Sequence, residues 1–364
     1  MKKALALLLL CLAPLLCGCG SLYGQRRELE QLRLMEALGL DAAPGGLILS
    51  LCSSPSEEEE TLCCTGAGVS LSQAMEKLRR SSGEELFCGH LQTILVGESY
   101  ARQDLEGLLS AVCRSSDLRL DQPVFLVLDG SAREALESGS AEGLLLPAAS
   151  REKAGSLSTA GGILRDLERQ GSSLIRTLRL QPSPREGAEG AALVPAGYGI
   201  LAEGKLLDLL PPEEAAAAEL LTGRLSPSPL LLRDGQGRAV TLELQDGESR
   251  LRPLWDEDGA LTGLEIHITV WATLLEIDGF PSPAQEDYRR ELCSRMEAEL
   301  TRRVGKLLER SRDLGTDFLG LGRRLELASP LRCRGLGVDL AGLLPSLALR
   351  LRIQGEIEHS NDMT

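Results

Sequence analysis

The C-terminal half of the chain alternates apolar and polar residues in three separate segments. Apolar side chains occupy every second position in residues 240–244, 264–270 and 347–353, and a period of two is typical of strands that bury one face. Asp-Gly pairs at residues 246–247 and 258–259 are typical of turns between antiparallel strands. The pattern therefore predicts an antiparallel sheet in this half of the chain.

One long helical pattern lies between the second and third of these segments. Ser282, followed by Pro283 and Gln285, is typical of a helix start, and Gly315 is typical of the position just past a helix end. The apolar residues between them recur every four positions, at Leu292, Met296, Leu300, Val304 and Leu308. Such a stripe predicts a long amphipathic helix that covers the apolar face of the sheet.

The N-terminal half contains short apolar segments that alternate with amphipathic ones. We expect strands at residues 47–51, 91–96 and 123–128, one helix from Ser70 onward, and another helix around residues 105–112. This order is typical of an α/β domain. The fold class expected for the whole chain is α/β (α+β), with several domains and mixed β-sheets flanked by helices.

A segment rich in proline, glycine and glutamate occupies residues 181–190. This composition is typical of an exposed linker, so it predicts the main domain boundary. We expect an N-terminal domain over residues 19–188, a C-terminal domain over residues 189–358 with room for two subdomains, and a tail over residues 359–364.

The start of the chain has the features of an export signal. Two lysines precede an apolar run over residues 4–16, and that run of 13 residues is shorter than the roughly 20 residues of a spanning helix. The sequence Leu-Cys-Gly-Cys then ends at Cys19. A cysteine directly after Leu-x-Gly can receive a diacylglyceryl group on its thiol, and two acyl chains anchor a protein stably. We expect cleavage after residue 18 and lipidation of Cys19; the alternative is an ordinary secreted protein.

Charge and composition exclude one class of partner. The formal net charge is −14 and aromatic residues make up only 3% of the chain, so a basic, aromatic-rich surface for nucleic acid is not expected. Residues 302–334 nevertheless carry nine Lys or Arg against four Asp or Glu. Four of these basic residues, Arg302, Arg303, Lys306 and Arg310, are our candidates for contact with an acidic partner or anionic lipid; a solvated helix face is the alternative.

Residues suited to catalysis are scarce. The three histidines each have a structural explanation. His267 occupies a polar position of an alternating strand, His359 lies in the tail, and His90, next to the strand at residues 91–96, is expected to be a hydrogen-bonded structural histidine. The sequence contains no HExxH, GxSxG or GxxxxGK motif. We therefore expect no enzyme, no cofactor and no metal site.

Seven cysteines follow Cys19, an odd number for an exported chain. Cys88 and Cys113 lie in apolar segments, where cysteine usually behaves as a small buried hydrophobe. We therefore favour mostly free thiols over a disulfide framework. A thiol oxidoreductase that uses Cys63 and Cys64 is an alternative, and it predicts an exposed thiol of low pKa.

Several segments, in order along the chain, resemble those of the Ger(x)C, or GerAC-like, spore germination lipoproteins. The most specific is Phe-Cys-Gly-His-Leu-Gln-Thr-Ile-Leu-Val-Gly-Glu at residues 87–98, which is similar to the family's FGH-hydrophobic-GE strand. The other segments with this resemblance are residues 27–29, 37–41, 114–119, 124–128, 131–136, 197–200, 204–207 and 317–322. The chain departs from the family at its mature start, where Cys-Gly-Ser replaces Cys-Trp-Asp.

The resemblance implies a lipid-anchored protein on the outer face of the spore inner membrane. It implies the C subunit of a nutrient germinant receptor, which is no enzyme and works beside integral-membrane A and B subunits. Cys19 would be its functional residue, and His90, Asp317 and Gly322 would determine the fold. A substrate-binding lipoprotein of a transporter, which is also an acidic, anchored α/β protein, is the alternative.

Overall fold

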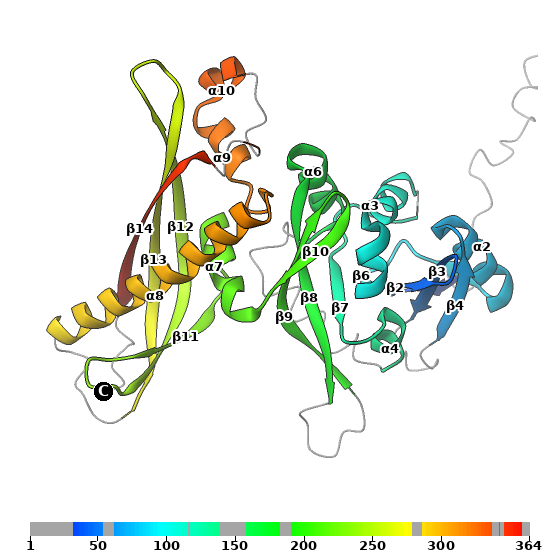
Figure 1. Cartoon of the computed structure of the whole chain (residues 1–364). Helices are drawn as coiled ribbons and strands as arrows, with labels where there is room; N and C mark the ends of the chain where they lie inside the picture. Colours follow the sequence, from blue (N-terminus) through cyan, green and yellow to red (C-terminus); the bar gives the residue numbers. More distant parts are fainter. Residues whose placement is uncertain are drawn as a thin grey trace, which may run out of the picture.

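The computed structural model of the chain describes residues 32–53, 62–115, 117–138, 158–182, 191–278, 286–336, 342 and 346–358. Within these ranges the strands form one eight-stranded sheet, one four-stranded sheet and one short two-stranded pair. Figure 1 shows the two large sheets in separate halves of the molecule, each with its own helices. The expected fold class, with several domains and mixed sheets flanked by helices, is confirmed.

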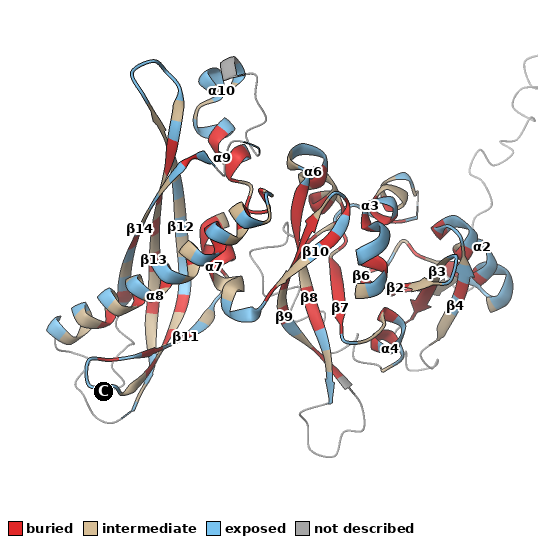
Figure 2. Ribbon diagram, viewed as in Figure 1, coloured by how far each residue is buried: buried red, intermediate tan, exposed pale blue. Residues whose placement is uncertain are grey.

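The eight-stranded sheet has a parallel centre and antiparallel edges. Strands β2, β6, β7 and β8 run parallel, and hairpins extend the sheet on both sides. The strands in sheet order are β10 (Lys205–Leu210), β9 (Ala191–Ala202), β8 (Ser172–Pro182), β7 (Val124–Leu128), β6 (Thr93–Gly97), β2 (Ala37–Ala43), β3 (Gly46–Cys52) and β4 (Cys63–Gly68). Every residue of β6 and β7 is buried (Figure 2), as parallel strands covered on both faces require.

Helices cover the two faces of this sheet unequally. One face packs against α2 (Leu71–Ser82), α3 (Glu98–Arg114) and α6 (Ala160–Gln170), and part of the other face packs against the short α4 (Ala132–Glu137). Outside the sheet, β1 (Leu32–Leu34) pairs in parallel with β5 (Glu85–Phe87). The expected strands and helices of this half are confirmed, including the start of α2, where the Ser70 hydroxyl accepts a hydrogen bond from the Gln73 amide.

The position of the expected domain boundary differs from the structure. Strands β8 and β9 form a hairpin in which Pro182 pairs with Ala191. Residues on both sides of 181–190 therefore belong to one sheet, and the change to the second sheet comes after β10. Proline, glycine and glutamate are as typical of a hairpin connection as of a linker, so composition alone could not separate the two.

The four-stranded sheet is only partly antiparallel. Its order is β11 (Ser228–Arg233), β12 (Ala239–Trp255), β13 (Leu261–Ile277) and β14 (Ala348–Glu358), and the last pair runs parallel. Between β13 and β14 the chain passes through α8 (Glu286–Asp313), α9 (Leu321–Ala328) and α10 (Pro330–Leu336), and such a crossover allows parallel pairing. The expectation of a purely antiparallel sheet is therefore wrong for β14.

The long helix α8 matches the expected apolar stripe. All five residues of the stripe are buried, and Gly315 follows the helix in the left-handed conformation with φ of +64°. The expected capping residues 282–285 lie outside the described residues. Of the two expected turns, residues 258–259 join β12 to β13, whereas residues 246–247 lie within β12 beside a register shift.

Helix α7 (Pro212–Thr222) joins the two halves of the molecule (Figure 1). Its buried face belongs to one apolar cluster that includes Tyr198 and Ile200 of the eight-stranded sheet and Leu242 and Ile266 of the four-stranded sheet. The two sheets thus share a core through this helix.

Candidate functional site

The lipidation site Cys19 lies outside the described residues, so it remains a prediction. Among the helices that the structure describes, none combines the length and the apolar character needed to cross a membrane. The candidate contact residues on α8, in contrast, are all described.

Two of these candidates, Arg302 and Arg303, share one carboxylate. Arg302 Nη2 lies 2.6 Å from Glu299 Oε1 and Arg303 Nε lies 2.8 Å from the same oxygen. Arg303 also donates to the Glu213 carbonyl oxygen of α7 at 3.2 Å. The hydrogen bond from Arg302, together with Arg303, lowers the pKa of Glu299 to about 2. Arg302 is exposed, whereas Arg303 is half-buried between α8 and α7.

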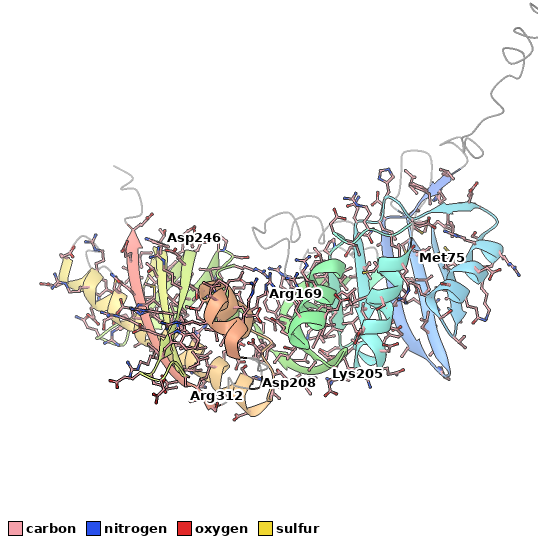
Figure 3. The ribbon with its side chains drawn as sticks, turned by 90° about the horizontal axis from the view of Figure 1, so that it is seen from above. Met75, Arg169, Lys205, Asp208, Asp246 and Arg312 are labelled. Atoms are coloured by element: carbon pink, nitrogen blue, oxygen red, sulfur yellow. A yellow bond between two sulfur atoms is a disulfide. The ribbon has the colours of Figure 1, made fainter. Side chains whose placement is uncertain are left out.

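Arg310 binds the other half of the molecule. Its Nη2 lies 2.7 Å from Asp208 Oδ2 and 2.9 Å from the Leu209 carbonyl oxygen, both in β10, and its Nη1 lies 3.0 Å from Glu214 Oε2 of α7. Figure 3 shows Asp208 where the two halves meet. Arg303 and Arg310 therefore hold α8 against the rest of the fold, and among the four candidates only Arg302 and Lys306 are exposed.

A pocket of about 620 Å³ opens between the two sheets. It lies over the face of the eight-stranded sheet that α7 and α4 leave uncovered between them, and β11 forms its far wall. Its lining residues are Phe125, Arg176, Thr177, Leu178, Pro195, Gly197, Tyr198, Pro212, Glu213, Ala215, Ala216, Glu219, Ser226, Pro227, Ser228, Pro229, Leu231 and Arg303.

Three polar side chains meet in the wall of this pocket. Tyr198 of β9 donates its hydroxyl to Glu219 Oε1 of α7 at 2.8 Å, and Arg176 Nη2 of β8 lies 3.6 Å from the same oxygen. The Arg176 guanidinium also lies 5.7 Å from the centre of the Tyr198 ring, within cation–π range. Burial raises the pKa of Tyr198, so the phenol stays protonated and donates.

This cluster of Arg176, Tyr198 and Glu219 was not predicted from the sequence. Arg176 is a charged residue within the apolar run Leu174 to Leu178, and Glu219 follows four consecutive alanines. A charged residue among apolar neighbours is a sequence signal for a buried polar contact, and both residues carry this signal. Their approach across two elements could not be inferred without the fold.

The expected fold determinants have different outcomes. Asp317 is buried, and its two carboxylate oxygens accept from the amides of Leu321 and Gly322 at 2.8 and 2.7 Å, so it caps the start of α9. Its structural role is confirmed. His90 is exposed and lies edge-on to the ring of Phe87, 6.1 Å between ring centres, so the expectation of a hydrogen-bonded structural histidine is not met.

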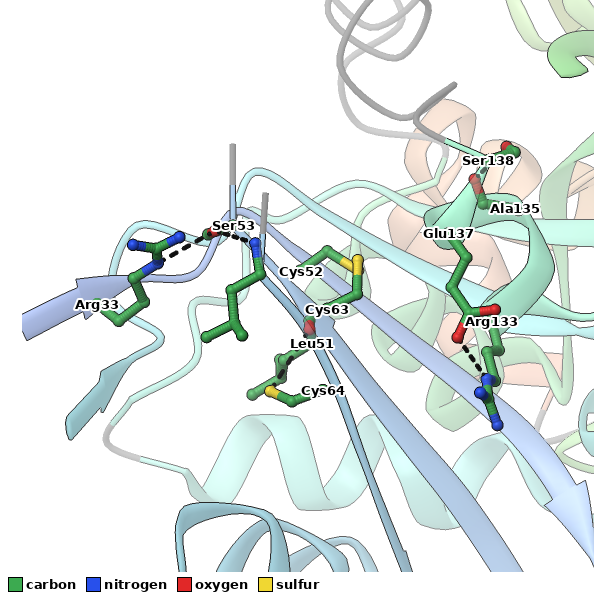
Figure 4. Close-up of a disulfide and its surroundings, with 11 residues drawn as sticks. Arg33, Leu51, Cys52, Ser53, Cys63, Cys64, Arg133, Ala135, Glu137 and Ser138 are labelled. Atoms are coloured by element: carbon green, nitrogen blue, oxygen red, sulfur yellow. Dashed lines mark hydrogen bonds and ion pairs between the residues drawn. A yellow bond between two sulfur atoms is a disulfide. The ribbon is translucent and has the colours of Figure 1, made fainter. Parts of the chain in front are cut away.

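Two of the described cysteines form a disulfide, and the other five are free, in agreement with the expectation of mostly free thiols. Cys52 of β3 and Cys63 of β4 are direct cross-strand neighbours and are bonded (Figure 4). The described cysteines Cys64, Cys88, Cys113, Cys293 and Cys333 are free. Burial raises the pKa of Cys64 to about 11, which contradicts the low-pKa thiol that an oxidoreductase needs.

Metal ligands do not gather in the described part of the chain. No three His, Cys, Asp or Glu side chains there are placed to hold one ion. His267 forms a pair with Glu265 at 3.3 Å on the exposed face of β13, which agrees with its expected structural role.

Comparison with known proteins gives two matches to family models and one to a solved structure. Residues 25–146 match the spore germination protein N-terminal domain, and residues 196–332 match the spore germination B3/GerAC-like C-terminal domain. The fold is similar to the crystal structure of the GerBC protein, with a TM-score of 0.58 and 16% identity over 88% of this chain and 96% of that one. No curated protein sequence matches the chain. The chain belongs to the GerAC-like family of spore germination proteins.

Proposed function

We propose that this chain is the lipid-anchored C subunit of a spore nutrient germinant receptor. It acts beside integral-membrane A and B subunits on the outer face of the spore inner membrane. The observation that carries the proposal is the pair of family matches, which together include strands of both sheets. The Leu-Cys-Gly-Cys sequence that ends at Cys19 supports the anchor.

The geometry supports a role in assembly or signalling rather than catalysis. In the described residues Arg303 and Arg310 of α8 pair with carboxylates of the same chain, and the thiols of Cys64 and Cys88 have raised pKa values.

Deletion of the gene tests the proposal. Spores should form normally, lose or delay their response to the nutrient that the receptor recognises, and still germinate with dodecylamine, which bypasses receptors. The wild-type gene should restore the response, whereas Cys19→Ala should restore it poorly and leave the protein out of the membrane fraction. A normal nutrient response in a strain without a second receptor for that nutrient would contradict the proposal. Loss of solute uptake with normal germination would instead favour a transporter lipoprotein.

A further inference from the structure

The pocket between the sheets has the size and the wall chemistry of a small-molecule site. Its volume of about 620 Å³ lies within the roughly 300–1,000 Å³ typical of ligand pockets. Apolar side chains form most of the wall, among them Phe125, Leu178, Pro195, Ala216 and Leu231. Apolar walls with a few placed polar groups are the common composition of such sites.

Three of the four charged side chains of the pocket wall, those of Arg176, Glu219 and Arg303, are bound to other groups of the protein, and the fourth, Glu213, is exposed. Glu219 accepts from the Tyr198 hydroxyl through Oε1 and from the Ser226 amide through Oε2 at 3.0 Å, and Arg176 lies beside it. Arg303 is held by Glu299. An ionic ligand that used one of these three groups would have to separate a pair at a cost in desolvation, whereas a neutral ligand leaves the pairs intact.

Two serine hydroxyls of the wall have no hydrogen-bond partner among the described residues. The Oγ atoms of Ser226 and Ser228 are buried, and both residues line the pocket. Buried hydroxyl groups ordinarily form hydrogen bonds, so these two hydroxyls are available to bind a polar atom of a ligand. A change of the χ1 rotamer reorients either hydroxyl, which lets it donate to an acceptor in the pocket.

We propose that this pocket binds a neutral, largely apolar small molecule that carries at least one hydrogen-bond acceptor. The apolar body would lie against Leu178, Ala216 and Leu231, and the acceptor would face Ser226 and Ser228. The site is formed by folded residues alone, so the proposal depends on neither the lipid anchor nor the receptor partners.

A neutral fluorescent ketone, prodan, is a suitable probe for the chain from residue 20 onward, which keeps every residue that the structure describes. We expect saturable binding of one prodan per chain with a blue-shifted emission, and little binding of the anionic dye ANS at the same site. Ala216→Trp should fill the pocket and abolish binding, and Ser228→Ala should weaken it about fivefold, the equivalent of one hydrogen bond between neutral groups.

Matched controls separate loss of the pocket from loss of the fold. Ala298→Trp places the same side chain on an exposed helix position outside the pocket and should leave prodan binding unchanged. Leu231→Asp alters an exposed pocket residue (65% exposed) without touching the core and should weaken binding at least about fivefold, whereas Leu275→Asp (51% exposed), outside the pocket, should not. Unchanged prodan binding in Leu231→Asp, or in a folded Ala216→Trp, would overturn the proposal. Displacement of prodan by ANS would overturn its neutral character.

Discussion

Arg310 Nη2 lies 2.7 Å from Asp208 Oδ2, although the two residues are 102 positions apart. The contact joins α8, which covers the four-stranded sheet, to β10 at the edge of the eight-stranded sheet. The same guanidinium also pairs through Nη1 with Glu214 Oε2 of α7. One arginine therefore connects the three elements that meet between the two halves.

Replacement of Arg310 by methionine should destabilise the fold. Methionine keeps much of the apolar stem but leaves the partly buried Asp208 and Glu214 carboxylates without their cation, so we expect a loss of about 1–2 kcal/mol in the free energy of unfolding. Arg302→Met is the matched control on the same helix, because Arg302 is exposed and should cost less than about 0.5 kcal/mol. Urea unfolding of both variants measures the difference; equal losses would show that the Arg310 contact contributes nothing specific.

Glu299 should make stability depend on acid pH. Hydrogen bonds, first from Arg302, lower its pKa from 4.5 to about 2 in the folded protein. The stabilisation is therefore complete above about pH 4.5 and is lost as the pH falls toward 2. Because both arginines have access to water, we expect only about 1 kcal/mol. Urea unfolding between pH 7 and 3 should show the wild-type advantage over Glu299→Gln shrinking as the pH falls below 4.5. An advantage that stays constant over this range would contradict the assignment.

The cysteines should separate clearly by reactivity. Peptide mapping without reductant should recover Cys52 and Cys63 as a linked pair, and native Cys64 should react slowly with iodoacetamide at pH 7.5 because its pKa is about 11. Loss of the disulfide in Cys52→Ser/Cys63→Ser should cost about 2–3 kcal/mol for a loop of this length. Cys64→Ser serves as the control for loss of a cysteine outside the bond. Rapid alkylation of native Cys64, at the rate of a free peptide thiol, would contradict its burial.

Local patterns in the sequence predicted the elements well. The stripe from Leu292 to Leu308 and the alternation in β12, β13 and β14 have one period each, and burial of one face follows directly from that period. The Ser70 cap depends on neighbouring residues only. Such features need no knowledge of distant contacts.

Relationships across the chain were harder to predict. Pairing of β8 with β9, parallel pairing of β14 with β13 and the Cys52–Cys63 bond each depend on which strands become neighbours. The pocket cluster is similar, because Arg176 and Glu219 are ordinary charges until two elements bring them together. The pairing of Arg310 within the chain was not predicted either, since its partners Asp208 and Glu214 lie about 100 residues earlier.

A cut between β8 and β9 should leave the molecule in one piece. A protease site inserted between residues 186 and 187 should yield two fragments that elute together, because the β8–β9 pairing and the shared core around α7 hold them. A single unfolding transition is expected for the cut protein. A chain cut instead within the described β-turn at residues 256–260 controls for cleavage itself. Separation of the fragments without denaturant would instead support the domain boundary at residues 181–190 that the sequence predicts.

Exposed charges on α8 should matter for contact with the proposed membrane partners only where they bind no other helix or strand of the fold. Arg303 and Arg310 bind α7 and β10, so reversing them would damage the fold and confuse the result. Arg302 and Lys306 are exposed and lie four positions apart on one helix face. Arg302→Glu/Lys306→Glu should therefore lower co-purification with the proposed A and B subunits several-fold, while the thermal transition of the isolated protein shifts by only a few degrees.

The matched control for this pair reverses Lys77 and Arg80 on α2, two exposed basic residues in the other half of the molecule. It changes the net charge by the same amount, so any general effect of a more acidic protein appears in both variants. If α8 forms the contact, only the Arg302/Lys306 variant should co-purify less with the subunits. Its loss of co-purification should be larger at low salt, where charge attraction is screened least. Equal recovery of the subunits with both variants would exclude this face of α8 as the contact, and it would leave the family assignment, which depends on residues 25–146 and 196–332, untouched.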